Sequence, residues 1–218
     1  MHLPGHIFFY EYNVNIYSHE GTMLLKKSTR IRKEEIIQAA LEVIGKKGVQ
    51  ALTIAAIAES AGMSDANIYR HFAGKDEIFT ALADFIGSAV MGKAATIAAG
   101  SRKPLEKLET IFFSHMALIA EHPGIPRFVF SEDVHLGNRK VAENIAFRMG
   151  NYVETLAGII AAGISENELR PGLSPRETAL TFIGMIQFTA LRWTIGNASF
   201  VIREEAEKLW DNFLRLVR

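Results

Sequence analysis

The sequence predicts an all-α protein of about nine helices, on three observations. Apolar residues recur at spacings of three and four along most of the chain, and no stretch alternates long enough to indicate a strand. Capping and helix-breaking residues fall between the periodic segments. Of the 218 residues, 49% are hydrophobic and 22% are charged, which is ordinary for a globular protein and excludes a disordered one.

Three helices are predicted near the N-terminus. The first ends near Gly48, and Thr53 is placed to cap a short second helix that Gly62 stops in a left-handed conformation. Ser64 is placed to cap a third helix that runs through Phe72. The apolar face of the first helix consists of Ile36, Ile37, Ala40, Leu41 and Ile44.

The middle of the chain also follows the helical period. A long helix is expected to begin near Asp76, and Pro104 suits the first turn of the next one. Residues 122–124 break that helix, and a short apolar segment follows at 126–130. A further long helix is expected over about 138–164.

Two apolar helices are predicted at the C-terminus, over 174–196 and 202–217. Both are apolar over a wider arc than a monomer's outer shell requires, so we expect them to pair across a two-fold axis in a homodimer. The most apolar stretch, 178–191, is shorter than the roughly 18 apolar residues of a membrane span. In the last helix we expect one side to be formed by Ile202, Ala206, Leu209, Phe213 and Leu216.

The charge distribution divides the chain, with a boundary near 73–75. Residues 24–75 hold nine Lys/Arg against five Asp/Glu, whereas the whole chain has no net charge. A basic head on an acidic body indicates that the head meets a polyanion. We therefore expect a head at 24–75, a body at 76–218, and an extra N-terminal segment at 1–23 of uncertain role.

A basic arm opens the first helix. Such an arm is able to lie along a DNA backbone or in a minor groove, and it is equally well explained as a solvated tail. The arm consists of Lys26, Lys27, Arg30, Arg32 and Lys33.

Residues 48–77 contain the most specific pattern in the chain. They predict two short helices around a tight turn, which is a helix-turn-helix whose second helix enters a major groove. On that helix Asn67 suits a bidentate pair with adenine and Arg70 one with guanine. The side chains expected to face outward there are Asp65, Ala66, Asn67 and Arg70, and those expected to hold phosphates are Thr53, Ser64, Tyr69, His71 and Lys75.

This run is similar to the TetR family of regulators. The similarity rests on Leu52-Thr53-Ile54, Ile57-Ala58, Ala61-Gly62-Met63-Ser64, Ile68-Tyr69, His71-Phe72 and Lys75-Asp76 at uninterrupted spacing. The resemblance implies phosphate contacts by Thr53, Ser64, Tyr69 and Lys75, and base contacts by the residues matching Asp65–Arg70 and His71. Asp65 departs from the pattern, because a carboxylate repels phosphate; it is expected to cap its own helix or to accept from a cytosine amine.

The resemblance also implies a body that binds a small molecule and forms the dimer. Ligand binding would shift the spacing of the two recognition helices, most often to relieve repression. Bulky apolar side chains with interspersed polar groups favour an apolar or aromatic ligand, although each of them is explained as well by core packing. The candidate pocket residues are Phe112, His115, Met116, Phe128, Phe147, Met185, Gln187 and Phe188.

Other classes of protein lack support in the sequence. There is no cysteine, no recognised catalytic motif and no ligand-spaced histidine pair, so no catalytic residue, no metal and no cofactor are expected. Residues 1–22 do not read as a signal peptide, and a cytoplasmic location without membrane contact is expected. The alternative is a helical protein-interaction module that binds no specific DNA sequence.

Overall fold

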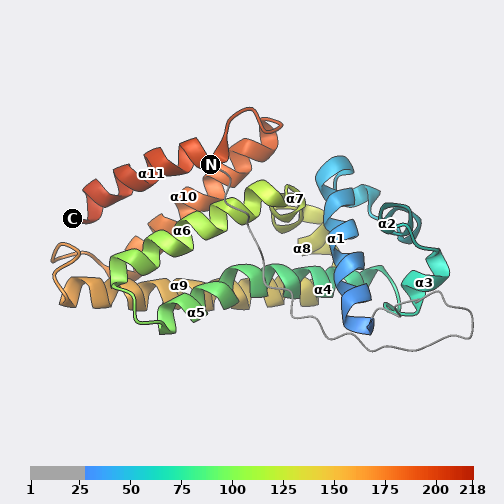
Figure 1. Cartoon of the computed structure of the whole chain (residues 1–218), viewed down its shortest axis with the longest axis horizontal. Helices are drawn as coiled ribbons and strands as arrows, with labels where there is room; N and C mark the ends of the chain where they lie inside the picture. Colours follow the sequence, from blue (N-terminus) through green and yellow to red (C-terminus); the bar gives the residue numbers. More distant parts are fainter. Residues whose placement is uncertain (1–27) are drawn as a thin grey trace, which may run out of the picture.

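The computed structural model describes residues 28–218, and the expected segment 1–23, Lys26 and Lys27 lie outside that range. Within the range every regular element is helical, which confirms the all-α prediction (Figure 1). The molecule is elongated, with α1 to α3 gathered at one end and the other helices packed lengthwise beside one another (Figure 1). The head contains α1 (Thr29–Lys47), a 3₁₀ turn η1 (Val49–Ala51), α2 (Ile54–Ala61) and α3 (Asp65–Tyr69).

Side-chain caps define the helices of the head as predicted. The Thr53 hydroxyl accepts a hydrogen bond from the Ala56 amide at 3.1 Å, and the Ser64 hydroxyl accepts one from the Asn67 amide at 3.3 Å. Gly62 ends α2 with φ 62° and ψ 37°, the left-handed conformation that glycine adopts without a Cβ penalty.

The third helix is shorter than predicted. It ends at Tyr69, because the amides of His71 and Phe72 both donate to the Ile68 carbonyl and so tighten the chain into a turn. The predicted continuation through Phe72 is therefore wrong, although Phe72 is still buried.

A continuous helical stretch leads from the head into the body. It consists of α4 (Lys75–Gly87), a π-helical turn η2 (Ser88–Gly92) and α5 (Lys93–Ala99), where the sequence predicts one long helix. By length and composition Lys75–Ala99 is apolar enough to cross a membrane, and 44% of its most apolar window is buried inside the protein. This stretch contacts α1 at one end and α9 and α6 along its length.

The body holds six further helices. Residues 126–130, predicted only as an apolar segment, belong mostly to α7, and α8 was not predicted because its short sequence shows no helical period. In chain order the helices are α6 (Pro104–Glu121), α7 (Gly124–Val129), α8 (Glu132–Gly137), α9 (Arg139–Ser165), α10 (Pro175–Ile195) and α11 (Ile202–Val217).

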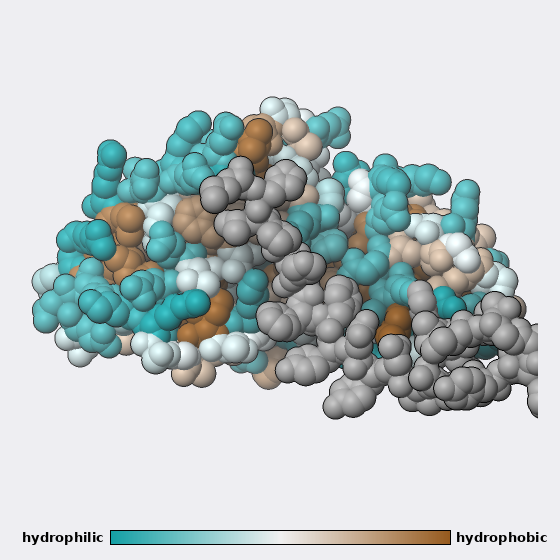
Figure 2. Space-filling model, in the orientation of Figure 1, coloured by the Kyte–Doolittle hydropathy of each residue, from teal (hydrophilic) through white to brown (hydrophobic). Residues whose placement is uncertain are grey.

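The last helix buries Ile202, Ala206 and Phe213 as predicted, but not the whole predicted set. Trp210 and Val217 are buried, whereas Leu216 is 52% exposed, so the predicted placement of Leu216 is wrong. The reason is an aromatic cluster with α6 and α10, in which the Trp210 ring centroid lies 5.5 Å from Phe112 and 5.7 Å from Phe213. The outer side of α11 is mainly hydrophilic (Figure 2), so the wide apolar arc predicted for this helix is wrong and its apolar side chains are mostly used against the body.

Candidate DNA interface and effector cavity

The short helix α3 presents the predicted reading surface. Asp65, Ala66 and Arg70 are exposed, and Asn67 is half-buried, while Ile68 is fully buried against the rest of the head. The predicted outward positions of Asp65, Ala66 and Arg70 are confirmed, while Asn67 is only partly exposed. An exposed short helix with amide and guanidinium side chains is able to reach base edges in a major groove.

Polar groups surround α3 on the same part of the surface. Thr53 and Ser64 are exposed, and each hydroxyl accepts its cap hydrogen bond, so each hydroxyl proton is available to a phosphate. Tyr69 is 56% exposed. Lys75 begins α4, with its Nζ 5.1 Å from the centre of the Phe79 ring, which orients the ammonium group without neutralising it.

Two residues of this surface differ from the simplest expectation. Ser64, not Asp65, makes the cap hydrogen bond of α3, and Asp65 occupies the first helical position, where a carboxylate favours the helix dipole. The His71 Nδ1 atom is buried without a hydrogen-bond partner within the described range, so only Nε2 could reach a group outside the protein.

The described part of the basic arm is largely engaged within the protein. Arg32 bonds Glu35 at 2.9 Å, and Arg30 lies 3.6 Å from Glu34. Lys33 lies 3.5 Å from Glu77 and 4.8 Å above the Phe72 ring. From Arg30 onward the arm is therefore part of α1, with its side chains held by neighbouring residues, and it is not a free tail.

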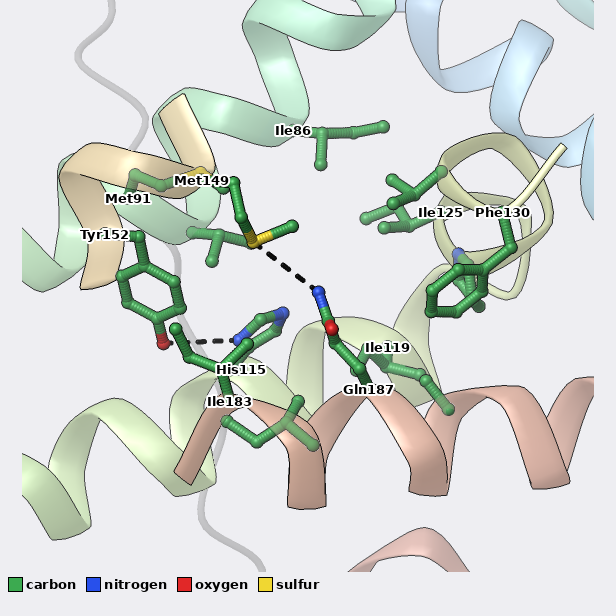
Figure 3. A pocket seen from close by; sticks show the side chains of 15 residues that line it. Ile86, Met91, His115, Ile119, Ile125, Phe130, Met149, Tyr152, Ile183 and Gln187 are labelled. Carbon is green, nitrogen blue, oxygen red and sulfur yellow. Dashed lines mark hydrogen bonds between the residues drawn. The ribbon is translucent and has the colours of Figure 1, made fainter. Parts of the chain in front are cut away.

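An apolar cavity lies within the body, and one of its walls is α7, which packs on α1 of the head (Figure 3). It has a volume of about 60 Å³, which holds a few water molecules but not a long chain unless the helices separate. Its walls come from α4, η2, α6, α7, α9 and α10: Ile86, Val90, Met91, His115, Ile119, Ile125, Pro126, Val129, Phe130, Met149, Tyr152, Ile183, Ile186, Gln187 and Ala190.

The three polar side chains of the cavity are uncharged at neutral pH. Burial lowers the pKa of His115 to about 4 and raises the pKa of Tyr152, so the imidazole and the phenol both stay neutral. The Tyr152 Oη lies 3.4 Å from His115 Nδ1, and the Gln187 amide donates to the Met149 sulfur at 3.5 Å (Figure 3). A neutral, mostly apolar wall suits an apolar ligand group.

Two of the eight predicted pocket residues, His115 and Gln187, line this cavity. Phe112, Met116 and Phe128 are buried in the core beside it, and Met185 packs against that core. Phe147 and Phe188 are 71% and 63% exposed, so these two side chains face outward instead.

The sequence reasoning missed the cavity wall contributed by α4 and α9. Ile86 and Tyr152 both line the cavity, and neither is among the predicted pocket residues. Met149 and Tyr152 lie three residues apart on α9, a helical spacing that places both on one face and was a usable signal.

A helix-turn-helix head, a long connecting helix and a helical body with an apolar cavity define a DNA-binding regulator of the ligand-responsive class. Family models bear this out: residues 36–82 match bacterial regulatory proteins of the tetR family, and residues 101–217 match the tetracyclin repressor-like C-terminal domain. The chain belongs to the TetR family and is a transcriptional regulator that binds DNA. This decides against the interaction module, and neither matched family is a family of enzymes.

Individual relatives have names that describe different roles. The chain is 31% identical over 150 residues to the nucleoid occlusion factor SlmA of Marinobacter nauticus, covering 68% of this chain and 74% of that protein. It is 26% identical over 175 residues to the fatty acid metabolism regulator protein of Bacillus subtilis, covering 80% and 89%.

Solved structures show the same fold. The regulator FadR from Bacillus subtilis, in complex with stearoyl-CoA, matches with a TM-score of 0.68 at 22% identity, covering 83% of this chain and 97% of that one. The ketosteroid regulator KstR2 of Mycobacterium tuberculosis matches with a TM-score of 0.70 at 20% identity, covering 85% and 94%.

Proposed function

We propose that this protein is a cytoplasmic repressor that binds its operator as a homodimer and is released by a small effector with an apolar, acyl-type chain. The observation that carries the proposal is the position of the neutral apolar cavity. Its wall includes α4, which leads into the head, and α7, which packs on α1. A ligand that enlarges this cavity has to move helices that hold the DNA-binding head.

We assign the head to residues 24–75 and the body to 76–218. In the head, phosphate contacts fall to Thr53, Ser64, Tyr69 and Lys75, and base contacts to the exposed side of α3 together with His71. The repressor form would hold the two recognition helices of the dimer about 34–36 Å apart, one turn of the duplex.

The homodimer is proposed to form through α10 and α11. Leu180, Phe188 and Ile195 are exposed on α10, and their spacing of seven or eight residues places them on one side of the helix. Leu216 adds an exposed apolar side chain on α11. An apolar stripe of this kind on a monomer marks a surface that a partner covers.

The cavity favours an alkyl chain as the group that enters it. Each buried methylene contributes about 0.8 kcal/mol, so a chain of several carbons supplies the energy needed to separate the helices. The matches from Bacillus subtilis support this class, because they carry the name fatty acid metabolism regulator protein and include a regulator solved with stearoyl-CoA.

A role in nucleoid occlusion is the second candidate, because the Marinobacter nauticus relative carries that name. The neutral cavity beside the head favours the effector-responsive regulator instead.

The test is a titration of the protein–operator complex with dodecanoyl-CoA, followed by fluorescence anisotropy of the labelled duplex. We expect release by the ligand, and we expect Ala190→Leu, which fills the cavity, to bind DNA normally but resist release. Ala95→Leu on the exposed side of α5 is the matched control and should respond as the parent does. Equal release of both variants would contradict the assignment of this cavity.

A further inference from the structure

A second, open cleft adjoins the apolar cavity. It has a volume of about 370 Å³ and lies between the end of α1 and η1 in the head and α7, α8 and α10 in the body. Pro126 and Phe130 line both the cavity and the cleft, and Phe130 is 40% exposed. Phe130 therefore stands at the junction, and a ligand that enters the cavity past it leaves its other end in the cleft.

Two basic side chains in the cleft have no partner among residues 28–218. Lys47 and Arg127 both line it, and no ion pair or hydrogen bond to either side chain occurs within residues 28–218. Arg127 is half-buried, and a partly desolvated guanidinium without a counter-ion is unfavourable. The cleft therefore lacks a counter-ion for these two side chains, and an anion would supply it.

The other polar groups of the cleft are consistent with an anionic guest. Gln50 and Ser131 offer neutral donors, whereas the Thr194 hydroxyl already donates to the Ala190 carbonyl. Asp133 is the single carboxylate that lines the cleft, so one positive charge remains in excess. Lys47 also stabilises the C-terminal end of α1 through the helix dipole. Arg127 lies in the last turn of a helix of only six residues, in which that effect is small.

We infer that this cleft binds the anionic group of an amphiphilic effector whose apolar chain occupies the neighbouring cavity. The inference rests on the proposed function and specifies its ligand: a carboxylate or the phosphates of a thioester-linked nucleotide, held by Lys47 and Arg127. Because Lys47 belongs to the head and Arg127 to the body, the anion bridges the two. The effector thereby fixes their relative position as well as enlarging the cavity.

Calorimetry on the full chain tests the inference with four probes: dodecanoyl-CoA, dodecanoate, dodecanol and CoA without a chain. Arg127→Gln and Lys47→Gln are each expected to weaken dodecanoyl-CoA binding about tenfold, the effect of losing one charged contact. Dodecanol binding should change less than twofold. Arg102→Gln, in the turn between α5 and α6 and outside both the cavity and the cleft, is the matched control and should leave all four probes unaffected.

The four probes separate the possible outcomes. If dodecanoate is weakened as well, any anionic head group suffices; if only dodecanoyl-CoA is weakened, the phosphates are the group recognised. Equal weakening of dodecanol, or no weakening of either anionic ligand, would overturn the inference. If CoA binds in an Arg127-dependent way and the chain adds no affinity, the cleft stands and the apolar effector of the proposed function fails. If dodecanol binds and an anionic group adds nothing, the cavity stands and the cleft is not a binding site.

Discussion

Gly124 at the start of α7 packs directly on the backbone of Leu41 in α1, so closely that a Cβ atom at position 124 would overlap the Leu41 carbonyl oxygen. Gly45, one turn further along α1, adjoins the same point, where a Cβ would lie 3.1 Å from the Gly124 nitrogen. Two glycines thus let α7 and α1 touch through their backbones. Since α7 also lines the cavity, this contact connects the cavity to the DNA-binding head without an intervening side chain.

Gly124→Ala is expected to force α7 and α1 apart. The overlap is with backbone, which cannot rotate away, so we expect a loss of about 1–3 kcal/mol in the free energy of unfolding and a weaker effector response. Urea unfolding measures the first, and effector-induced release of DNA the second. Gly150→Ala on α9, where a Cβ meets nothing within 4 Å, is the control and should be neutral or stabilising. A Gly124→Ala protein as stable and responsive as the parent would contradict this role for the contact.

The buried His115 gives stability a specific dependence on pH. Burial lowers its pKa to about 4 in the folded state, against 6.5 when unfolded, so below pH 6.5 the unfolded state binds a proton that the folded state does not. Stability is therefore lost as the pH falls from about 6.5 to about 4, by at most roughly 3 kcal/mol, and this contribution levels off below pH 4. His115→Gln should show a flatter profile in urea unfolding between pH 7 and 4. Parallel profiles for the two proteins would show that His115 is not the responsible group.

The exposed apolar stripe of α10 predicts the effect of one charge on assembly. Phe188→Glu places a carboxylate in the proposed dimer interface, where desolvation without a partner is unfavourable, and should yield monomers in analytical ultracentrifugation. Leu136→Glu on α8 replaces a side chain that is 78% exposed and lies outside the stripe, so that protein should remain dimeric. Dimers for Phe188→Glu at micromolar concentration would place the interface elsewhere.

Arg70 and Lys75 are expected to fail in different ways when each is replaced by alanine. Arg70→Ala should relax preference at one base position per half-site, at a cost of about 1–3 kcal/mol.

Lys75→Ala should weaken binding to all sequences alike and flatten the salt dependence by about one unit per half-site. Binding measured over a salt series on matched and mismatched duplexes separates the two. Uniform loss for Arg70→Ala would make it a phosphate contact, and an unchanged salt slope would remove Lys75 from the phosphate set.

Local rules predicted the head well and the cavity poorly. Thr53, Ser64 and Gly62 act within a few residues of their own position, so their caps and turn follow from the sequence alone. The cavity instead combines α4, α9 and α10, and its composition depends on how these helices pack. Phe188 and Tyr152 illustrate the difference: both are aromatic residues on long apolar helices, yet one faces outward and the other closes the cavity.

The cleft could not be predicted from the sequence for the same reason, because it too depends on how the helices pack. Lys47 and Arg127 stand eighty positions apart, and neither is unusual at the end of a helix. Only the packing of α7 on α1 brings both to one opening. No pattern within a single helix could have indicated that they share a site.

The most direct test of the central claim is selection of bound sequences from a random duplex library by the purified, effector-free protein at physiological salt. The account predicts an enriched inverted repeat whose half-sites are about one duplex turn apart, as two recognition helices on a two-fold axis require. Selection of no preferred sequence by the folded protein would contradict sequence-specific regulation by this chain.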